Sequence, residues 1–122
     1  MPPTAETSKE RRRTFGRRAD GIRLVTMTSP RIALVKVSGE LDVASARYLR
    51  AALDDVAGRD IDGPVVVDVT DLRFIDGSGV RTLLDGGRRL GRQGHRLVVR
   101  GPQPAVARVL RATSATAELT VR

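Results

Sequence analysis

The chain has 122 residues, a length typical of one domain that can bury a sizeable core. It has no cysteine, which excludes disulfides, thiolate catalysis and cysteine-bound metal and is typical of a reducing compartment. Hydrophobic residues make up 40% of the chain but aromatic residues only 2%, so aliphatic side chains must build the core. No apolar run is long enough for a bilayer span or a secretory signal, so we expect a cytoplasmic protein without membrane insertion.

The formal net charge of +8 is diffuse. Residues 1–21 carry six basic and three acidic side chains (net +3), and residues 22–122 carry sixteen and eleven (net +5). The polar composition and the Pro-Pro start of residues 1–21 predict a disordered basic leader, followed by a domain over residues 22–122. Nucleic-acid binding by this leader is disfavoured, because Phe15 is its only aromatic residue for stacking on bases.

Two β-rich runs open the domain. Ile22–Met27 and Ile32–Val37 flank Ser29-Pro30, and this pattern predicts a β-hairpin. A helix is expected next, capped by Asp42 and ending at Gly58, because apolar residues then recur at helical spacing. Those residues are Ala46, Leu49, Leu53 and Val56.

The second half alternates strands with helices. Pro64–Val69 is almost continuously apolar, as in a central strand that is covered on both faces. A helix carrying Val80, Leu83 and Leu84 on its inner side follows, and its glycines either allow close approach of a neighbour or end it early. Arg96–Val99 predicts a strand, Pro104 a helix start, and Leu119–Val121 a last strand. We therefore predict an α/β domain with a mixed β-sheet and helices packed on it.

A polar turn, Asp76-Gly77-Ser78-Gly79, stands where the chain leaves a strand and begins a helix. Asp76 or Ser78 can accept hydrogen bonds from the first free N–H groups, and the glycines leave the helix start open. The surroundings of Ser78 are not Gly-x-Ser-x-Gly, and His95 is the only histidine that could act as a base. We expect no enzyme activity, no cofactor and no metal.

Four segments have the order and spacing of a known family: Val37–Asp42, Val66–Leu72, Phe74–Val80 and Pro104–Val106. Over residues 22–122 the chain resembles the STAS domain of bacterial anti-sigma factor antagonists. The resemblance implies binding to an anti-sigma factor of the ATP-dependent serine kinase type, which releases a sigma factor for transcription. It also implies that phosphorylation at the turn ends the binding, because a phosphate adds nearly two negative charges to a buried contact.

In this family the phosphate acceptor directly follows the aspartate of the turn, and that position is Gly77 here. Ser78 is the alternative acceptor, at the next position. Arg81 stands where the family often has glycine, so it either rejects the usual kinase or pairs with a phosphate on Ser78. The resemblance places the partner surface on Ser38, Gly39, Glu40, Asp42, Asp76, Gly77, Ser78, Gly79 and Arg81.

Several alternatives stay open. The domain could be a STAS subunit of another assembly, such as a lipid-transport ATPase or a sensory complex. A terminal helix common in the family is missing after Leu119, and an apolar face left uncovered there suggests a homodimer. The candidate aspartates have a purely structural interpretation as helix caps, and the arginines of the second helix one as a solvated face.

Overall fold

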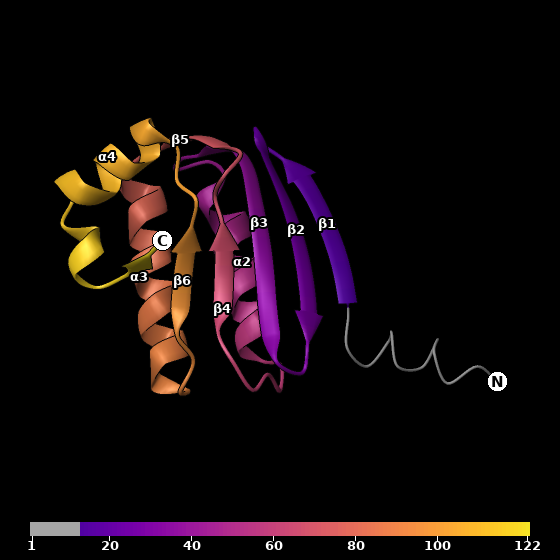
Figure 1. The fold of residues 1–122 in the computed structure, drawn as a ribbon. Helices are drawn as coiled ribbons and strands as arrows, with labels where there is room; N and C mark the ends of the chain where they lie inside the picture. Colours follow the sequence, from indigo (N-terminus) through magenta and orange to yellow (C-terminus); the bar gives the residue numbers. More distant parts are fainter. Residues whose placement is uncertain (1–12) are drawn as a thin grey trace.

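The computed structural model describes the backbone of residues 13–122 and the side chains of residues 19–122. Seven strands form one sheet: β1 (Arg13–Ala19), β2 (Ile22–Ser29), β3 (Ile32–Leu41), β4 (Val65–Asp68), β5 (Leu72–Ile75), β6 (Leu97–Arg100) and β7 (Thr120–Val121). The helices are α2 (Ala46–Ala57), α3 (Gly77–Arg92), α4 (Pro104–Ala112) and the short 3-10 helix η1 (Ala115–Ala117). The predicted α/β architecture with a mixed sheet is confirmed (Figure 1).

The strands follow the spatial order β1-β2-β3-β4-β6-β7, and β5 pairs with β3 at the end of β3 that lies beyond β4. The pairs β1–β2 and β2–β3 are antiparallel, whereas β3–β4, β4–β6 and β6–β7 are parallel. The predicted hairpin is present, with Ser29 opposite Ile32 at its turn. The four residues of β4 are all buried, which confirms the predicted central strand.

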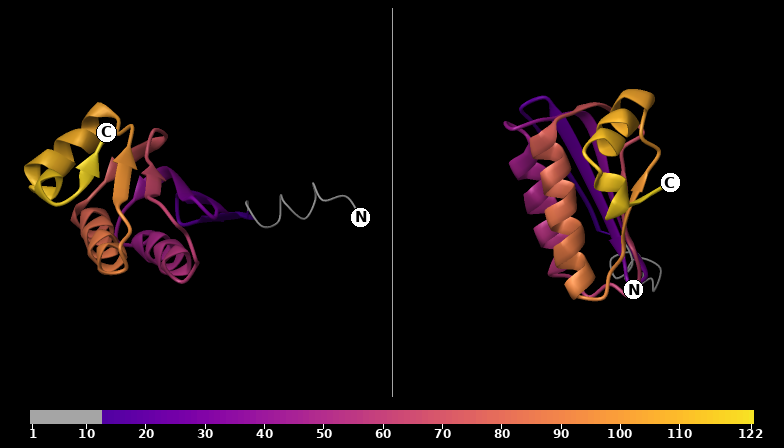
Figure 2. Two further views of the ribbon diagram at one scale, coloured as in Figure 1. Left: turned by 60° about the horizontal axis from the view of Figure 1, so that its bottom comes forward. Right: turned by 90° about the vertical axis from the view of Figure 1, so that its left-hand side faces the viewer.

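Helices α2 and α3 lie side by side on one face of the sheet, and α4 lies on the other side (Figure 2). The core lies between the sheet and its helices and includes Val106 and Leu110 of α4, and the predicted apolar positions of α2 are all buried in it. In α3, Val80 and Leu83 are buried as predicted and Leu84 is half-buried. No helix among the described residues is long and apolar enough to cross a membrane.

The glycines of α3 serve helix packing. Instead of ending early, the helix runs through Gly86, Gly87 and Gly91 to Arg92. A Cβ atom on Gly86 would lie 2.6 Å from Leu53 Cδ1 of α2, so glycine is what lets the two helices approach this closely. Of the two alternatives that the sequence left open, close approach is therefore correct at this position.

The sheet extends into the residues that the sequence analysis assigns to the leader. Residues 13–19, which the sequence analysis assigns to the disordered leader, form β1 and pair with β2 from Arg13 opposite Thr28 to Ala19 opposite Ile22. Their arginines and glycine hide the strand signal, and the edge of β2 supplies the backbone partners that favour it. The leader's remaining residues 1–12 lie outside the described residues, as does any contact that they make with nucleic acid.

Candidate partner-binding site

Pairing between β3 and β5 sets the position of the α3 start. Leu41 lies opposite Ile75 in this parallel pair, and the Asp76 N–H donates to the Leu41 carbonyl at 3.2 Å. The Asp76 carboxylate then caps α3, because its Oδ1 accepts from the N–H groups of Ser78 at 2.9 Å and Gly79 at 3.1 Å. Of the two predicted cap residues, Asp76 is the one that makes these hydrogen bonds.

The glycines on either side of Ser78 have different roles. A Cβ on Gly79 would come within 2.7 Å of Ile75 and 2.8 Å of Leu41, so residue 79 must lack a side chain for α3 to rest on the ends of both strands. A Cβ on Gly77 would meet no other atom within 4 Å. Gly77 therefore leaves the first residue of α3 open to a partner, while Gly79 serves the core.

The short turn that connects β3 to α2 is stabilised by hydrogen bonds of Asp42 and Ser45. Asp42 Oδ1 accepts from the N–H groups of Ala44 at 3.0 Å and Ser45 at 3.1 Å. The buried Ser45 hydroxyl donates to the Glu40 carbonyl at 2.8 Å and accepts from the Asp42 N–H at 3.0 Å. The predicted cap by Asp42 is therefore wrong: Asp42 stabilises the turn before the helix, and α2 begins four residues later, at Ala46, with Ser45 in the N-cap position and no side-chain cap hydrogen bond. The turn between them accounts for this offset.

Ser38 and Gly39, two residues of the predicted partner surface, lie where β3 pairs with β5 and β2. Ser38 and Gly39 line a hollow of about 630 Å³ together with Asp71, Arg73 and Gln103. Gly39 has φ of +95°, and a Cβ there would collide with the Gly21 carbonyl oxygen, so glycine is required by the backbone. Its N–H donates to the Asp71 carbonyl at 3.1 Å. The backbone conformation and these contacts are enough to explain why residue 39 is glycine, without any contact to a partner.

The sequence analysis did not identify two exposed apolar side chains, those of Phe74 and Val43. Phe74, opposite Glu40 in the β3–β5 pair, has 49% of its surface exposed, and Val43 in the turn before α2 has 77%. Phe74 is three residues before Gly77 in the chain, and Val43 is two residues after Leu41, the sheet partner of Ile75. Large exposed apolar residues are typical of a protein contact. The sequence holds no signal for Phe74, because Arg73 and Phe74 are both exposed and β5 breaks the alternation of a strand.

Asp68, the last residue of β4, and Asp71, three residues later, bond to residues of neighbouring strands and of the loop after β4. Asp68 Oδ1 accepts from the Thr70 N–H at 2.9 Å and its hydroxyl at 2.7 Å, and Oδ2 accepts from Arg100 Nη2 at 2.9 Å. Burial by itself raises the pKa of Asp68, but the hydrogen bonds from Thr70 and Arg100 outweigh it and lower that pKa below its ordinary value. Asp71 pairs with Lys36 at 3.2 Å. Both carboxylates are therefore occupied by neighbours.

Among the remaining candidates, His95 has a partner in a neighbouring loop. His95 Nδ1 lies 3.0 Å from the Gly63 carbonyl oxygen, a contact that ties the loop before β6 to the loop before β4. Arg81 is exposed, one turn after Ser78 on α3, and Ser78 is half-buried. Across the described residues, no three His, Cys, Asp or Glu side chains gather in a way that could hold a metal ion.

A sequence profile of the family described as "Mlab, STAS domain" matches residues 26–120. The chain belongs to this STAS family. The match begins inside β2 and ends in β7, so it covers most of the sheet and all of α2, α3 and α4. A comparison with curated proteins finds no significant match for this STAS domain.

Solved structures give the same fold. The STAS domain is similar to an anti-sigma factor antagonist from Mycobacterium paratuberculosis, with 25% identity, a TM-score of 0.64, and coverage of 92% of this chain and 86% of that one. It is similar to the unphosphorylated antagonist SpoIIAA, with 18% identity, a TM-score of 0.66 and coverage of 90% and 88%. The Bacillus cell fate determinant SpoIIAA in its phosphorylated form has 17% identity, a TM-score of 0.59 and coverage of 90% and 91%.

Proposed function

We propose that this STAS domain is a cytoplasmic anti-sigma factor antagonist, which binds an anti-sigma factor of the ATP-dependent serine kinase type and so releases a sigma factor. The observation that carries the proposal is the open start of α3 at Gly77 near the exposed Phe74. Its solved relatives are described as antagonists of anti-sigma factors, which supports the same role here.

The contact surface that we propose is centred on Val43, Phe74, Gly77, Ser78 and Arg81. The two apolar side chains would be buried by the partner, and burial of a large aromatic residue is a common source of binding energy. Gly77 allows the partner backbone to come close to the helix start, where no side chain intervenes. Asp76 contributes by fixing the turn through its two hydrogen bonds rather than by touching the partner.

At the position that the family resemblance assigns to the phosphate acceptor, Gly77 offers no hydroxyl. We propose that Ser78 is the acceptor if the switch is retained. A phosphate on Ser78 would sit in the first turn of α3, where the helix dipole and Arg81 both favour negative charge. It would also place nearly two negative charges inside the proposed contact.

Affinity capture from the protein's own cells tests the proposal, with wild type compared with Phe74→Ala and Ser78→Glu. We expect mass spectrometry to identify a kinase-type anti-sigma factor with wild type, and both variants to recover about tenfold less of it or lower. Ile32→Ala is the matched control, because Ile32 is also a large exposed apolar residue but lies at the opposite end of β3. It should capture as much partner as wild type.

Capture of a different class of protein would point to a different function. STAS domains resembling this one also serve as subunits of lipid-transport ATPases, and the matching family carries the name Mlab. Recovery of an ATPase subunit in place of an anti-sigma factor would overturn the antagonist role. Equal capture by wild type and Phe74→Ala would overturn the contact surface. Homodimer formation stays a prediction, which sedimentation velocity at several concentrations tests directly.

A further inference from the structure

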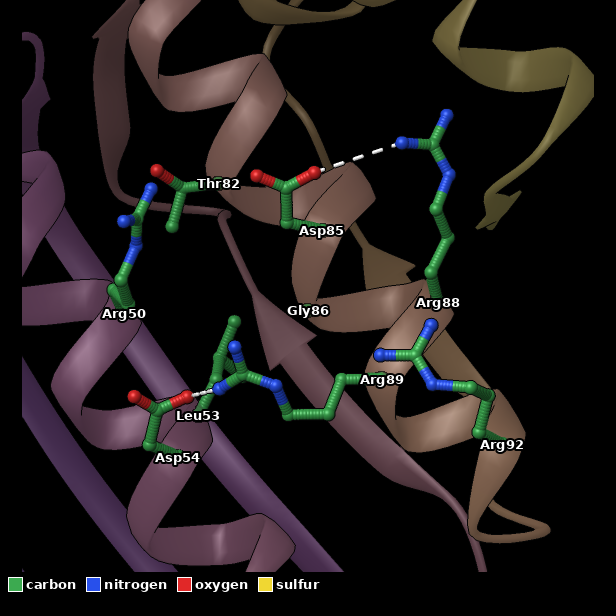
Figure 3. A pocket seen from close by; sticks show the side chains of 9 residues that line it. All are labelled: Arg50, Leu53, Asp54, Thr82, Asp85, Gly86, Arg88, Arg89 and Arg92. Carbon is green, nitrogen blue, oxygen red and sulfur yellow. Dashed lines mark ion pairs between the residues drawn. The ribbon is translucent and has the colours of Figure 1, made fainter.

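A groove of about 230 Å³ runs between α2 and α3 on the side of these helices that faces away from the sheet (Figure 3). We call it the arginine groove, because four of its nine lining residues are arginines. Its lining is Arg50, Leu53, Asp54, Thr82, Asp85, Gly86, Arg88, Arg89 and Arg92. With four guanidinium groups and two carboxylates, this lining carries a net charge of +2. The groove is separate from the Gly77 turn, which contributes no residue to it.

Two of the four arginines are already held by carboxylates of this chain. Arg89 reaches across from α3 and pairs with Asp54 of α2, which closes the middle of the groove. Arg88 pairs with Asp85 at 3.5 Å and with Glu118 at 2.8 Å. These pairs neutralise both acidic groups of the lining, so the charge available to a ligand comes from the other two arginines.

Arg50 and Arg92 are exposed, and neither has an ion-pair partner within residues 19–122. Arg50 lies beside Thr82 at one end of the groove, whereas Arg92 lies at the last residue of α3 (Figure 3). Thr82, beside Arg50, and Arg92 are ten residues apart on α3, so these two backbone positions are about 15 Å apart along the helix. A ligand that neutralises both must carry two negative groups at this spacing.

We propose that the arginine groove binds an acidic helical segment of a protein partner, with one carboxylate on Arg50 and another on Arg92. Acidic side chains eleven residues apart on a helix lie about 16 Å apart and on nearly the same face, which matches this spacing. Arginine can bind each carboxylate with two parallel hydrogen bonds. The site is independent of the antagonist role, because it uses a different surface and a different kind of contact.

The pattern of charge favours a protein segment over a polyphosphate or a nucleic acid. Asp54 and Asp85 belong to the same lining and are only part-exposed to a ligand behind their arginine partners, so a ligand with a negative charge every few ångströms would still approach two carboxylates. The lining also has no aromatic side chain on which a base could stack. A helix whose acidic residues are three turns apart avoids both problems.

The test uses a synthetic alanine-rich helical peptide of about 16 residues with two glutamates eleven positions apart, and a second peptide with glutamines in their place. Binding to the full chain is measured by fluorescence anisotropy at low salt. We expect the glutamate peptide to bind about fivefold or more tightly than the glutamine peptide, as two exposed ion pairs allow. The Arg50→Glu/Arg92→Glu variant should abolish that preference.

The matched control is Arg108→Glu/Arg111→Glu, which makes the same charge change at exposed arginines of α4, on the other side of the sheet. It should keep the preference, and circular dichroism should give wild-type spectra for both double variants. Equal binding of the two peptides, or equal loss in both variants, would overturn the proposal. It would also be overturned if a deoxythymidine decamer bound more tightly than the glutamate peptide in a way that depends on Arg50 and Arg92.

Discussion

The starts of α2 and α3 use the same hydrogen-bonding device with opposite results. In each, one aspartate oxygen accepts from the N–H groups two and three residues later, which are Ala44 and Ser45 for Asp42 and Ser78 and Gly79 for Asp76. In each, the aspartate carbonyl also accepts from the N–H four residues later. Yet α3 is helical from Gly77, whereas α2 is helical only from Ala46.

The residue three positions after each aspartate makes the difference. Ser45 is fully buried and turns its hydroxyl back to the Glu40 carbonyl, so the chain before α2 is tied to the end of β3. Gly79 has no side chain and lets α3 settle onto Leu41 and Ile75. The start of α2 is thus held by polar contacts of Ser45. The start of α3 is held by apolar packing at Gly79, while its first residue, Gly77, stays exposed.

The largest effect is expected at the packed glycine. Gly79→Ala forces a methyl group against Leu41 and Ile75, and overpacking of this kind should lower the free energy of unfolding by about 2 kcal/mol. Urea denaturation measures the change. Gly91→Ala in the same helix is the control, because a Cβ there meets no atom within 4 Å and should stabilise the protein slightly through helix propensity. Equal effects would mean that residue 79 is not closely packed.

Removing the α3 cap should have the next largest effect. Asp76→Ala leaves the N–H groups of Ser78 and Gly79 without their acceptor and should cost about 1–2 kcal/mol of unfolding free energy. Asp76→Asn keeps an acceptor oxygen, so thermal denaturation should place it close to wild type. If both variants lost the same stability, the cap would stabilise α3 through the negative charge of Asp76 rather than through its hydrogen bonds.

The matching change at α2 should cost less. Asp42→Ala removes the acceptor for Ala44 and Ser45, but Ala44 is exposed and water can replace that bond. We expect a loss of about 0.5–1 kcal/mol in urea denaturation. A loss larger than that of Asp76→Ala would reverse the comparison and make α2 the more dependent helix start.

The smallest effect on stability is expected at the open residue. Gly77→Ser adds a side chain where a Cβ meets no other atom, so the free energy of unfolding should change by less than about 0.5 kcal/mol. The variant restores a hydroxyl directly after Asp76. Incubated with ATP and the kinase-type partner, it should gain one phosphate by mass spectrometry, at a site that wild type lacks. Absence of that phosphate would indicate that the partner does not present its kinase site to this turn.

Much of the fold followed from sequence because its signals are local. The period of apolar residues identified α2 and α3, and the apolar run of β4 identified the centre of the sheet. Pro104 marked the start of α4 correctly. These elements carry their own pattern and need no knowledge of their neighbours.

The parts that were missed depend on neighbours distant in sequence. β1 is held by the edge of β2, and β5 by the far end of β3, so neither needs a pattern of its own. At the site, Asp76 could be identified from capping preference, but the exposure of Phe74 depends on how β5 sits against β3. The close approach of Gly39 to Gly21 is likewise a contact between two strands that local sequence does not reveal.

The bare first residue of α3 also bears on how an antagonist built in this way would be controlled. With no hydroxyl at residue 77, and as long as Ser78 carries no phosphate, occupancy of the partner would follow mass action, set by the amounts of the two proteins and their dissociation constant. At a free antagonist concentration ten times that constant, about nine in ten partner molecules would be bound. Synthesis and degradation would then set the concentration of the antagonist, and the fraction of bound partner would change gradually with that concentration.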